Sequence, residues 1–335
     1  MKPLRWGIVS AGNISHDFTN ALATLPKEDH QVVAISARKL ADASNFAKLH
    51  GIGKFYEGYE SLAKDADVDV VYIGSINPTH YDIGIMMLDH GKHVLCEKPL
   101  CMNESQSKRL LAHAKEKKLF IMEGIWSRFF PAYALLKERI DAGALGEIKE
   151  VDVEFGFYMS DVDRLRSKEL GGGTVLDLGV YTIQAALWAF KAPPEKIVAI
   201  GELNEEGVDM QVIAELHFPG GGIARMKTSA LEKLDNQAII QGTKGTITLN
   251  DFWCSTSLTD VDGSLKNFPL ETGPHCFNFP NSGGLRYEAE HTRQCLITGK
   301  IESDIVPHSE SLLIAQIQDE MRKLIGVRFP EDGCK

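Results

Sequence analysis

Short apolar runs alternate with helical patterns through roughly residue 125. Turn-forming residues bound the apolar runs, which is typical of buried strands, and amphipathic stretches lie between them. Strands separated by helices pair in parallel, so the pattern predicts an α/β Rossmann domain over residues 1–125. The predicted strands are 4–9, 31–36, 69–74, 93–96 and 119–122, and the predicted helices include 15–25, 40–50 and 104–117.

From about residue 149 the rhythm changes to longer segments in which apolar and polar residues alternate. The run Val151, Val153 and Phe155, with acidic residues between, indicates a strand buried on one face. Further runs separated by Gly-rich turns predict an α+β domain over residues 126–335, with an open, mainly antiparallel sheet for substrate binding and dimerisation. The expected elements are strands 196–203, 210–218, 222–230, 238–242 and 246–249, a helix over 174–190, and a last helix over 309–325 that could pack back on the first domain.

Composition narrows the class of protein. The 46 acidic and 36 basic residues give a formal net charge of -10, which disfavours a nucleic-acid partner. No stretch approaches the roughly 18 consecutive apolar residues of a membrane span, so we expect no membrane partner. The six cysteines lack CxxC spacing, which favours a cytoplasmic protein without disulfides and without a metal site.

A degenerate glycine-rich turn follows the first predicted strand. In the segment GIVSAGNIS, Ser10 and Ser15 stand where the dinucleotide-binding fingerprint has its outer glycines, and Gly12 is retained. The backbone at Gly12, Asn13 and Ile14, where the next helix begins, could bind a pyrophosphate. An ordinary strand-to-helix turn would explain this segment equally well.

Two cations follow the second predicted strand, at the position where an NAD enzyme usually has Asp or Glu to bind ribose hydroxyls. Arg38 can grip a 2'-phosphate with its planar guanidinium, and Lys39 adds a second positive charge. The pair therefore predicts NADP as the cofactor. The alternative is two solvated residues at the start of a helix.

The third and fourth strands end in Asn77-Pro-Thr-His80 and in Glu97-Lys98-Pro99. Ligands of open parallel sheets bind at these carboxyl ends, so we expect Asn77, Glu97 and Lys98 near the cofactor. Pro99 restrains the preceding residues to an extended form, which presents Lys98 at the strand tip. Spacing alone would also allow a surface lysine before a proline.

These motifs resemble the glucose-fructose oxidoreductase / inositol dehydrogenase (Gfo/Idh/MocA) superfamily, in which a degenerate Gly-rich turn, N-P-x-H and E-K-P recur in this order. The resemblance continues in residues 122–131, 172–181 and 242–245 and spans essentially the whole chain. Within the superfamily, the segments LRWGIVS and WSRFFP resemble NADP-dependent, homodimeric enzymes that oxidise trans-dihydrodiols and D-xylose. One position departs from that group, because Asp42 stands where a second phosphate-binding arginine is expected.

The resemblance implies roles for individual residues. Lys98, Asp177 and Tyr181 would line the nicotinamide, and Tyr72 and His80 would lie near the coenzyme. Both of the latter could instead be structural, Tyr72 as a packed strand residue and His80 as a helix cap.

Asp177 and Tyr181 are four residues apart on a predicted helix and should share one face. Tyr181 is the expected general acid/base, and Lys98 would favour its phenolate, since a free tyrosine has a pKa near ~10. Asp177 would orient the substrate hydroxyls or the lysine. A helix-stabilising polar pair would explain the spacing as well. The glycines at 171–173 suit either a close approach to a ligand or a flexible helix entry.

Trp126, Phe155 and Phe279 could wall the substrate pocket, with core packing as the alternative, favoured for Phe155. The sequence thus predicts an NADP-dependent oxidoreductase acting by hydride transfer on a small molecule, either trans-dihydrodiols or aldopentoses such as D-xylose. Rival functions are reduction of dicarbonyls or keto sugars, NAD-dependent glycoside cleavage, and non-catalytic cofactor-binding regulation.

Overall fold

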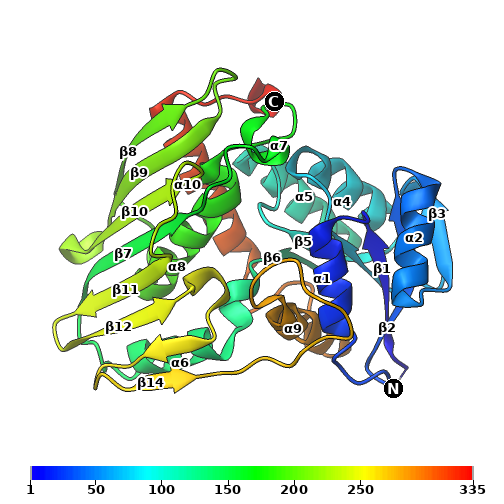
Figure 1. Cartoon of the computed structure of the whole chain (residues 1–335), viewed down its shortest axis with the longest axis horizontal. Coiled ribbons are helices and arrows are strands. Elements are labelled where there is room, and N and C mark those ends of the chain that lie inside the picture. Colours follow the sequence, from blue (N-terminus) through cyan, green and yellow to red (C-terminus); the bar gives the residue numbers. More distant parts are fainter. Residues whose placement is uncertain (1, 334–335) are drawn as a thin grey trace. The chain divides into compact units, whose positions relative to one another are not determined.

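The computed structural model describes residues 2–333 and divides the chain into two compact units (Figure 1). Neither unit is one continuous segment. Unit 1 includes the segment Leu270–Ser311, which the sequence pattern assigned to the second domain. Unit 1 comprises Met1–Cys101, Gln106–Phe129 and Leu270–Ser311, and unit 2 comprises Met102–Ser105, Phe130–Pro269 and Leu312–Lys335.

Unit 1 is built on a six-stranded parallel sheet of order β3-β2-β1-β4-β5-β6. The order reverses between β1 and β4, and in such sheets ligands bind outside the carboxyl ends of the strands at this point. The predicted α/β Rossmann fold is therefore confirmed. The strands are β1 (Leu4–Val9), β2 (His30–Ala37), β3 (Lys54–Glu57), β4 (Val70–Ile73), β5 (His93–Glu97) and β6 (Ile121–Gly124).

Helices flank this parallel sheet. In unit 1, α2 packs on β2 and β3, α4 packs on β4 and β5, and α1 packs on α9. The α helices are α1 (Asn13–Leu22), α2 (Leu40–His50), α3 (Glu60–Ala63), α4 (His80–Asp89), α5 (Glu104–Lys117) and α9 (Leu285–Ile297), and short helices lie at η1 (Asn77–Thr79), η2 (Trp126–Phe129) and η6 (Ser282–Gly284).

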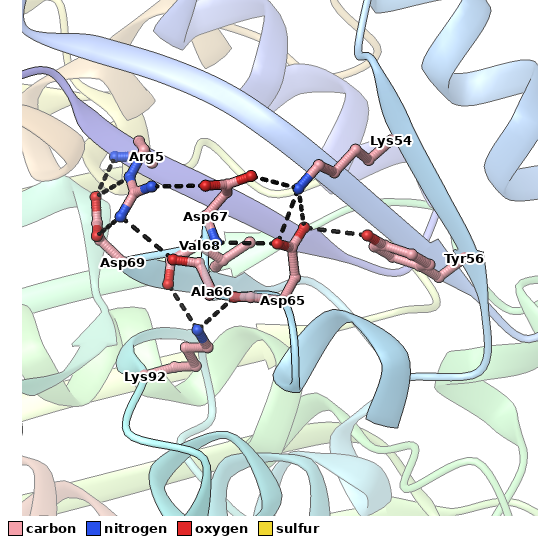
Figure 2. A network of polar contacts seen from close by, with 9 residues as sticks. All are labelled: Arg5, Lys54, Tyr56, Asp65, Ala66, Asp67, Val68, Asp69 and Lys92. Atoms are coloured by element: carbon pink, nitrogen blue, oxygen red, sulfur yellow. Dashed lines mark hydrogen bonds and ion pairs between the residues drawn. The ribbon is translucent and has the colours of Figure 1, made fainter.

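A network of ion pairs ties the turn at residues 65–69 to the amino-terminal ends of the strands (Figure 2). Arg5 donates to Asp69 at 2.7 Å from β1, and Lys54 donates to Asp65 at 2.9 Å from β3. Lys92, just before β5, donates to the backbone oxygen of Asp65 at 2.6 Å. The network stabilises the amino-terminal ends of the strands, whereas ligands of such sheets bind at the opposite, carboxyl ends.

Unit 2 is built on an eight-stranded sheet of order β14-β13-β12-β11-β7-β10-β9-β8. Its neighbouring strands run antiparallel except β7 and β10, so the expected open, mainly antiparallel sheet is confirmed. The strands are β7 (Ile148–Gly156), β8 (Lys196–Leu203), β9 (Asp209–His217), β10 (Ile223–Ser229), β11 (Gln237–Gly242), β12 (Gly245–Asn250), β13 (Ser257–Thr259) and β14 (Leu265–Asn267).

The helix expected over 174–190 is wrong in its first turn, which is a π-helical turn, η3 (Val175–Gly179), followed by α8 (Val180–Phe190). The unusual turn begins beside a buried carboxylate, since Asp209 accepts from the amide of Val175 at 2.7 Å and from the hydroxyl of Thr174 at 2.9 Å. The other helices are α6 (Pro131–Asp141), α7 (Asp163–Arg166), α10 (His308–Ile325), η4 (Pro219–Gly221), η5 (Phe252–Cys254) and η7 (Pro330–Gly333).

The glycines before this turn have a packing role. A Cβ on Gly173 would lie 2.4 Å from Asp209 Oδ1, and one on Gly172 would lie 2.2 Å from the carbonyl oxygen of Leu165. These glycines therefore let the backbone approach the Asp209 carboxylate and the turn at Leu165, both of which belong to the protein itself. Burial raises the pKa of the Asp209 carboxyl to about 6.

Within residues 2–333, none of the helices combines the length and the apolar composition that crossing a membrane requires. Five cysteines in this range are free thiols: Cys96, Cys101, Cys254, Cys276 and Cys295. Cys334, for which the sequence also predicts a thiol, lies outside the described residues.

Candidate active site

The degenerate turn after β1 has the backbone of a nucleotide-binding loop. Ser10 has a φ of 80°, a left-handed conformation that explains why glycine is usual there. Gly12 precedes α1 with a φ of -80°, and a Cβ there would have its nearest neighbour, Ser10 Oγ, at 3.6 Å. The protein itself therefore does not require glycine at position 12, which agrees with the expected approach of a ligand there.

A second substitution in the fingerprint is compensated by another residue. Ser15 stands where a glycine normally lets α1 pack closely on the sheet. The space is provided by Gly74, because a Cβ on Gly74 would lie 2.4 Å from Ser15 Oγ and 2.9 Å from Tyr72 Cε1. Helix α1 can therefore still pack closely on the sheet, because the glycine that this contact needs is Gly74, directly after β4.

A cavity of about 530 Å³ opens at this turn, within the usual size range of ligand sites. Four residues of the expected cofactor set line it, including Arg38. The sequence did not indicate Tyr59, because the short loop that carries it contains no recognisable motif. It also did not indicate the apolar wall that α2 provides. The lining residues are Ser10, Ala11, Gly12, Asn13, His16, Ala37, Arg38, Asp42, Asn45, Phe46, Leu49, Tyr59 and Asn278.

The segment 275–279 is held against α1 by two buried side chains. Asp17 accepts from the amides of Asn278 at 2.8 Å and Phe279 at 2.9 Å. Asn20 donates to the carbonyl oxygen of His275 at 2.7 Å and accepts from its amide at 2.9 Å. These contacts bring Asn278 to the cavity. No sequence motif marks Asp17 or Asn20, so the sequence did not indicate these contacts.

The E-K-P turn is anchored by a buried tyrosine. The Tyr72 hydroxyl donates to Glu97 Oε1 at 2.6 Å, and its ring stacks on Phe18 with centroids 3.8 Å apart. Glu97 Oε2 accepts from the amide of Lys98 at 3.2 Å, and the Lys98–Pro99 peptide is cis. Tyr72 has no exposed surface, so its geometry favours the packing role over direct contact with a coenzyme.

His80 bridges two loops at the carboxyl ends of β4 and β5. Its Nδ1 lies 2.8 Å from the carbonyl oxygen of Pro99, and its Nε2 lies 3.0 Å from that of Ser75. Burial lowers the pKa of this imidazole, while the two carbonyls oppose that shift. The fully buried ring favours the structural role, in which His80 holds the E-K-P turn in place. Asn77 lies in η1, just before it.

Two buried carboxyl groups lie behind this turn. Glu123 accepts from the amide of Leu100 at 2.9 Å, and burial raises the pKa of its carboxyl to about 7. Glu288 has no hydrogen-bond partner among the described residues, and burial, then the neighbouring Glu97, raise the pKa of its carboxyl well above the usual range. The Glu288 carboxylate lies over Gly124, where a Cβ would be 3.6 Å away.

In unit 2, Asp177 lies in the π-helical turn and Tyr181 in the first turn of α8. Asp177 accepts from Arg164 of α7 at 2.8 Å, so a guanidinium that the sequence did not single out offsets its charge. The Tyr181 ring meets Phe155 edge-on, with centroids 5.5 Å apart. This contact fixes the ring of the expected acid/base.

The three expected aromatic wall residues differ in exposure. Phe155 is buried and stacks on Trp253, with centroids 4.6 Å apart, which favours the core role for Phe155. Trp126 is also buried, whereas Phe279, the last residue of segment 275–279, is 38% exposed. Trp253 was missed by the sequence reasoning because no periodic pattern marks the short helix η5 that carries it.

Comparison with known proteins completes this picture. Residues 4–125 match the model of an oxidoreductase family with an NAD-binding Rossmann fold, and residues 133–248 match the GFO/IDH/MocA C-terminal domain. The chain belongs to the Gfo/Idh/MocA oxidoreductase family. A trans-1,2-dihydrobenzene-1,2-diol dehydrogenase of Xenopus tropicalis is 45% identical over 328 residues, which is 97% of this chain and 99% of the relative.

Solved structures of a reductase and a dehydrogenase share the fold. A 3-ketoreductase of Actinomadura kijaniata, in complex with NADP, has a TM-score of 0.82 at 26% identity over 97% of this chain and 98% of its own. A levoglucosan dehydrogenase in complex with NADH has a TM-score of 0.85 at 20% identity over 97% of both chains. This family member is therefore an oxidoreductase with a Rossmann fold of the kind that binds nicotinamide cofactors.

The family motifs of this oxidoreductase are divided between the units. Lys98, Arg38 and the glycine-rich turn belong to unit 1, and Asp177 and Tyr181 belong to unit 2. Lys39 lies at the start of α2, where it is exposed, and Ile14 lies in the first turn of α1. A joint action of Lys98 and Tyr181 stays a prediction.

Proposed function

We propose that the protein is an NADP-dependent dehydrogenase of trans-dihydrodiols and of aldopentoses such as D-xylose. The observation that carries the proposal is the 45% identity, over nearly the whole chain, to a trans-1,2-dihydrobenzene-1,2-diol dehydrogenase. The name of that relative supports the first substrate class. The resemblance of the LRWGIVS and WSRFFP segments supports both classes.

The cavity at the glycine-rich turn supports a dinucleotide cofactor. The start of α1 offers backbone amides and a positive helix end to a pyrophosphate, and Gly12 leaves room for it. Arg38 in the same cavity would bind a 2'-phosphate, which favours NADP, whereas Asp42 would weaken that preference. Fluorescence titration with NADPH and NADH in parallel tests this, and equal affinities would count against the phosphate role of Arg38.

In the proposed chemistry, Tyr181 transfers the proton and Lys98 supplies a positive charge beside it. A bound nicotinamide supplies hydride acceptance or donation. Tyr181 takes the proton of the reacting hydroxyl, or returns it in the reverse direction, and Lys98 makes this easier by favouring the phenolate. Asp177, held by Arg164, accepts hydrogen bonds from substrate hydroxyls and so orients them. Phe155 keeps the Tyr181 ring in one orientation.

The substitution Tyr181→Phe tests this assignment, because it removes the acidic hydroxyl and keeps the ring that packs on Phe155. Turnover should fall by roughly 100-fold to 10,000-fold, as is usual when a general acid or base is lost. Coenzyme titration should be unchanged. Near-normal turnover with a trans-dihydrodiol and with D-xylose would show that another group transfers the proton.

A second candidate is reduction of a keto sugar or dicarbonyl by the same site. It is favoured by the likeness to the 3-ketoreductase, which was solved with NADP. Initial rates in both directions distinguish the two candidates. Stoichiometric reduction of freely exchanging NADP by substrate would also exclude a glycosidase that keeps its NAD bound, and any turnover would exclude a purely regulatory protein.

Assembly and location complete the proposal. We infer a homodimer formed through the outer face of the unit 2 sheet, where Ile200 is 66% and Ile213 is 45% exposed on paired strands. A cytoplasmic location agrees with the exposed thiol of Cys276, which a reducing compartment would preserve. Cell fractionation with an antibody to the chain checks the location.

A further inference from the structure

Three side chains of different types converge near the end of α9 in unit 1. His291 and Cys295 are four residues apart on this helix and share one face, and Asp304 follows in the next loop. The Cys295 sulfur lies 3.3 Å and Asp304 Oδ1 lies 3.7 Å from His291 Nε2. One ligand atom from each residue falls within 4.8 Å of the other two.

The convergence is on a single ring nitrogen, which limits what the cluster can do. Ser303 Oγ also lies 2.8 Å from His291 Nε2, so a thiol, a hydroxyl and a carboxylate all face that atom. A nucleophilic triad would need the thiol and the carboxylate on opposite nitrogens of the imidazole. One nitrogen can form one good hydrogen bond in its plane, whereas a cation could be ligated by the imidazole, the thiol and the carboxylate together.

The spacing suits a zinc-type ion. Zinc bonds of ~2.3 Å to sulfur and ~2.0–2.2 Å to nitrogen and oxygen, at tetrahedral angles, separate the ligand atoms by roughly 3.3–3.6 Å. The separations of 3.3 Å from Nε2 to the sulfur and 3.7 Å from Nε2 to the carboxylate oxygen lie within a few tenths of an ångström of that range, and the sulfur and a carboxylate oxygen lie within 4.8 Å of each other. We propose that His291, Cys295 and Asp304 form a binding site for a divalent zinc-class cation, with water in the fourth position.

The charges of the cluster define how binding would proceed. Cysteine ligates zinc as the thiolate, so binding displaces the thiol proton: Zn²⁺ and Cys–SH give Zn²⁺–S⁻–Cys and one released H⁺. His291 would ligate through Nε2 as the neutral imidazole, because Nε2 is the ring nitrogen that the thiol and the carboxylate face. Lys300 opposes the cation, because its ammonium lies 3.2 Å from Asp304 Oδ2.

A bound ion would be structural. The loop that carries Asp304 turns on Ser303, whose Oγ accepts from the amides of Ile305 and Val306 at 3.0 Å. The carbonyl oxygen of Ile301 accepts from the amide of Ile121 in β6 at 3.3 Å. The metal would therefore link the end of α9 to the loop that contacts β6. This proposal departs from the sequence expectation of no metal site, which rested on CxxC spacing alone.

Cobalt titration of the full chain tests the site. Metal-free protein in a non-chelating reducing buffer should bind one Co²⁺ with a thiolate-to-cobalt absorption band and visible bands of tetrahedral intensity, and Zn²⁺ should displace it. The thiolate band should be lost in Cys295→Ser and kept in Cys276→Ser, which removes the exposed thiol elsewhere in unit 1. A band that persists in Cys295→Ser, or no thiolate band in the unsubstituted protein, overturns the proposal.

Two exposed substitutions keep the test independent of folding. Asp304 is 67% and Lys300 is 46% exposed, so changing either should leave the fold intact. Asp304→Asn should weaken Zn²⁺ binding at least tenfold, and Lys300→Met should strengthen it a few-fold because it removes the competing ammonium. Unchanged affinities in both variants, measured by competition with a chromophoric chelator, would mean that Zn²⁺ binds elsewhere.

Discussion

At the scale of single residues, the two glycines near the coenzyme cavity have opposite reasons to be glycine. Gly12 has an ordinary backbone conformation and open space around it, whereas Gly74 is enclosed by Ser15 and Tyr72. A methyl group on Gly12 should therefore weaken coenzyme binding about tenfold or more, while the free energy of unfolding changes by less than about 0.5 kcal/mol. NADPH titration and urea unfolding measure the two quantities.

The matched control is Gly74→Ala. Its methyl group would meet Ser15 Oγ at 2.4 Å, so this variant should lose roughly 1–3 kcal/mol of stability through overpacking. If Gly12→Ala binds NADPH as well as the unsubstituted protein, the glycine-rich turn does not contact the coenzyme.

Glu123 makes stability depend on pH. Its folded pKa of about 7 exceeds the ordinary value of 4.5, so the folded state binds the proton more tightly than the unfolded state does. Stability from this group is therefore present below about pH 4.5 and is lost as pH rises to about 7. Glu123→Gln cannot lose a proton, so it should remove this loss. As pH rises from about 4.5 to about 7, its free energy of unfolding should increase by up to about 3 kcal/mol relative to that of the unsubstituted protein.

Thermal unfolding at a series of pH values checks this prediction. The exposed Glu28, changed to Gln, serves as the control because its carboxyl is solvated. A stability difference between the protein and Glu123→Gln that does not vary from pH 5 to pH 8 would contradict a buried, proton-binding carboxyl.

At the scale of elements, segment 275–279 depends on one helix. Asp17 is fully buried and accepts hydrogen bonds from Asn278 and Phe279. Asp17→Ala should leave these donors unpaired and cost about 2–3 kcal/mol, with faster hydrogen exchange at both amides. Because Asn278 lines the cavity, coenzyme affinity should fall as well. Asp17→Asn keeps one acceptor and should be milder, and unaltered exchange in Asp17→Ala would exclude the clamp.

The sequence predicted elements best where one physical signal dominated. The apolar run over 4–9 gave β1 with its observed bounds, and alternation gave β8 over 196–203. β3 was missed because it is a four-residue edge strand with few apolar side chains, and β13 and β14 were missed because each has three residues. The π-helical turn depends on Asp209, far along the chain, and no local pattern encodes it.

The candidate site was predictable to the same extent. Arg38 and the glycine-rich turn follow strand ends, where topology places ligands, so local reasoning reached them. The ion pair of Arg164 with Asp177 and the stacking of Trp253 on Phe155 join segments that only the folded sheet brings together. Sequence patterns do not report such long-range pairs.

At the scale of the whole molecule, the proposed homodimer requires an apolar interface on the unit 2 sheet. Ile200 faces Ile213 on the neighbouring strand, and both are exposed on that outer face. Ile200→Glu should place an unpaired charge in the interface and shift the protein to monomers at micromolar concentration. Sedimentation velocity measures this shift. Leu265→Glu, at an exposed site on β14, should leave the assembly unchanged, and dimers that survive Ile200→Glu must use another surface.

The interleaving of the two units along the chain has a consequence for biosynthesis. The six strands of the parallel sheet are complete by Gly124, but α9 and the partners of Asp17 lie beyond residue 270. A ribosome must therefore translate beyond residue 297 before the first unit can close over its own buried carboxylates. Until then, the part of the Rossmann unit that α9 and segment 275–279 cover stays exposed in the nascent chain, where chaperones can bind it.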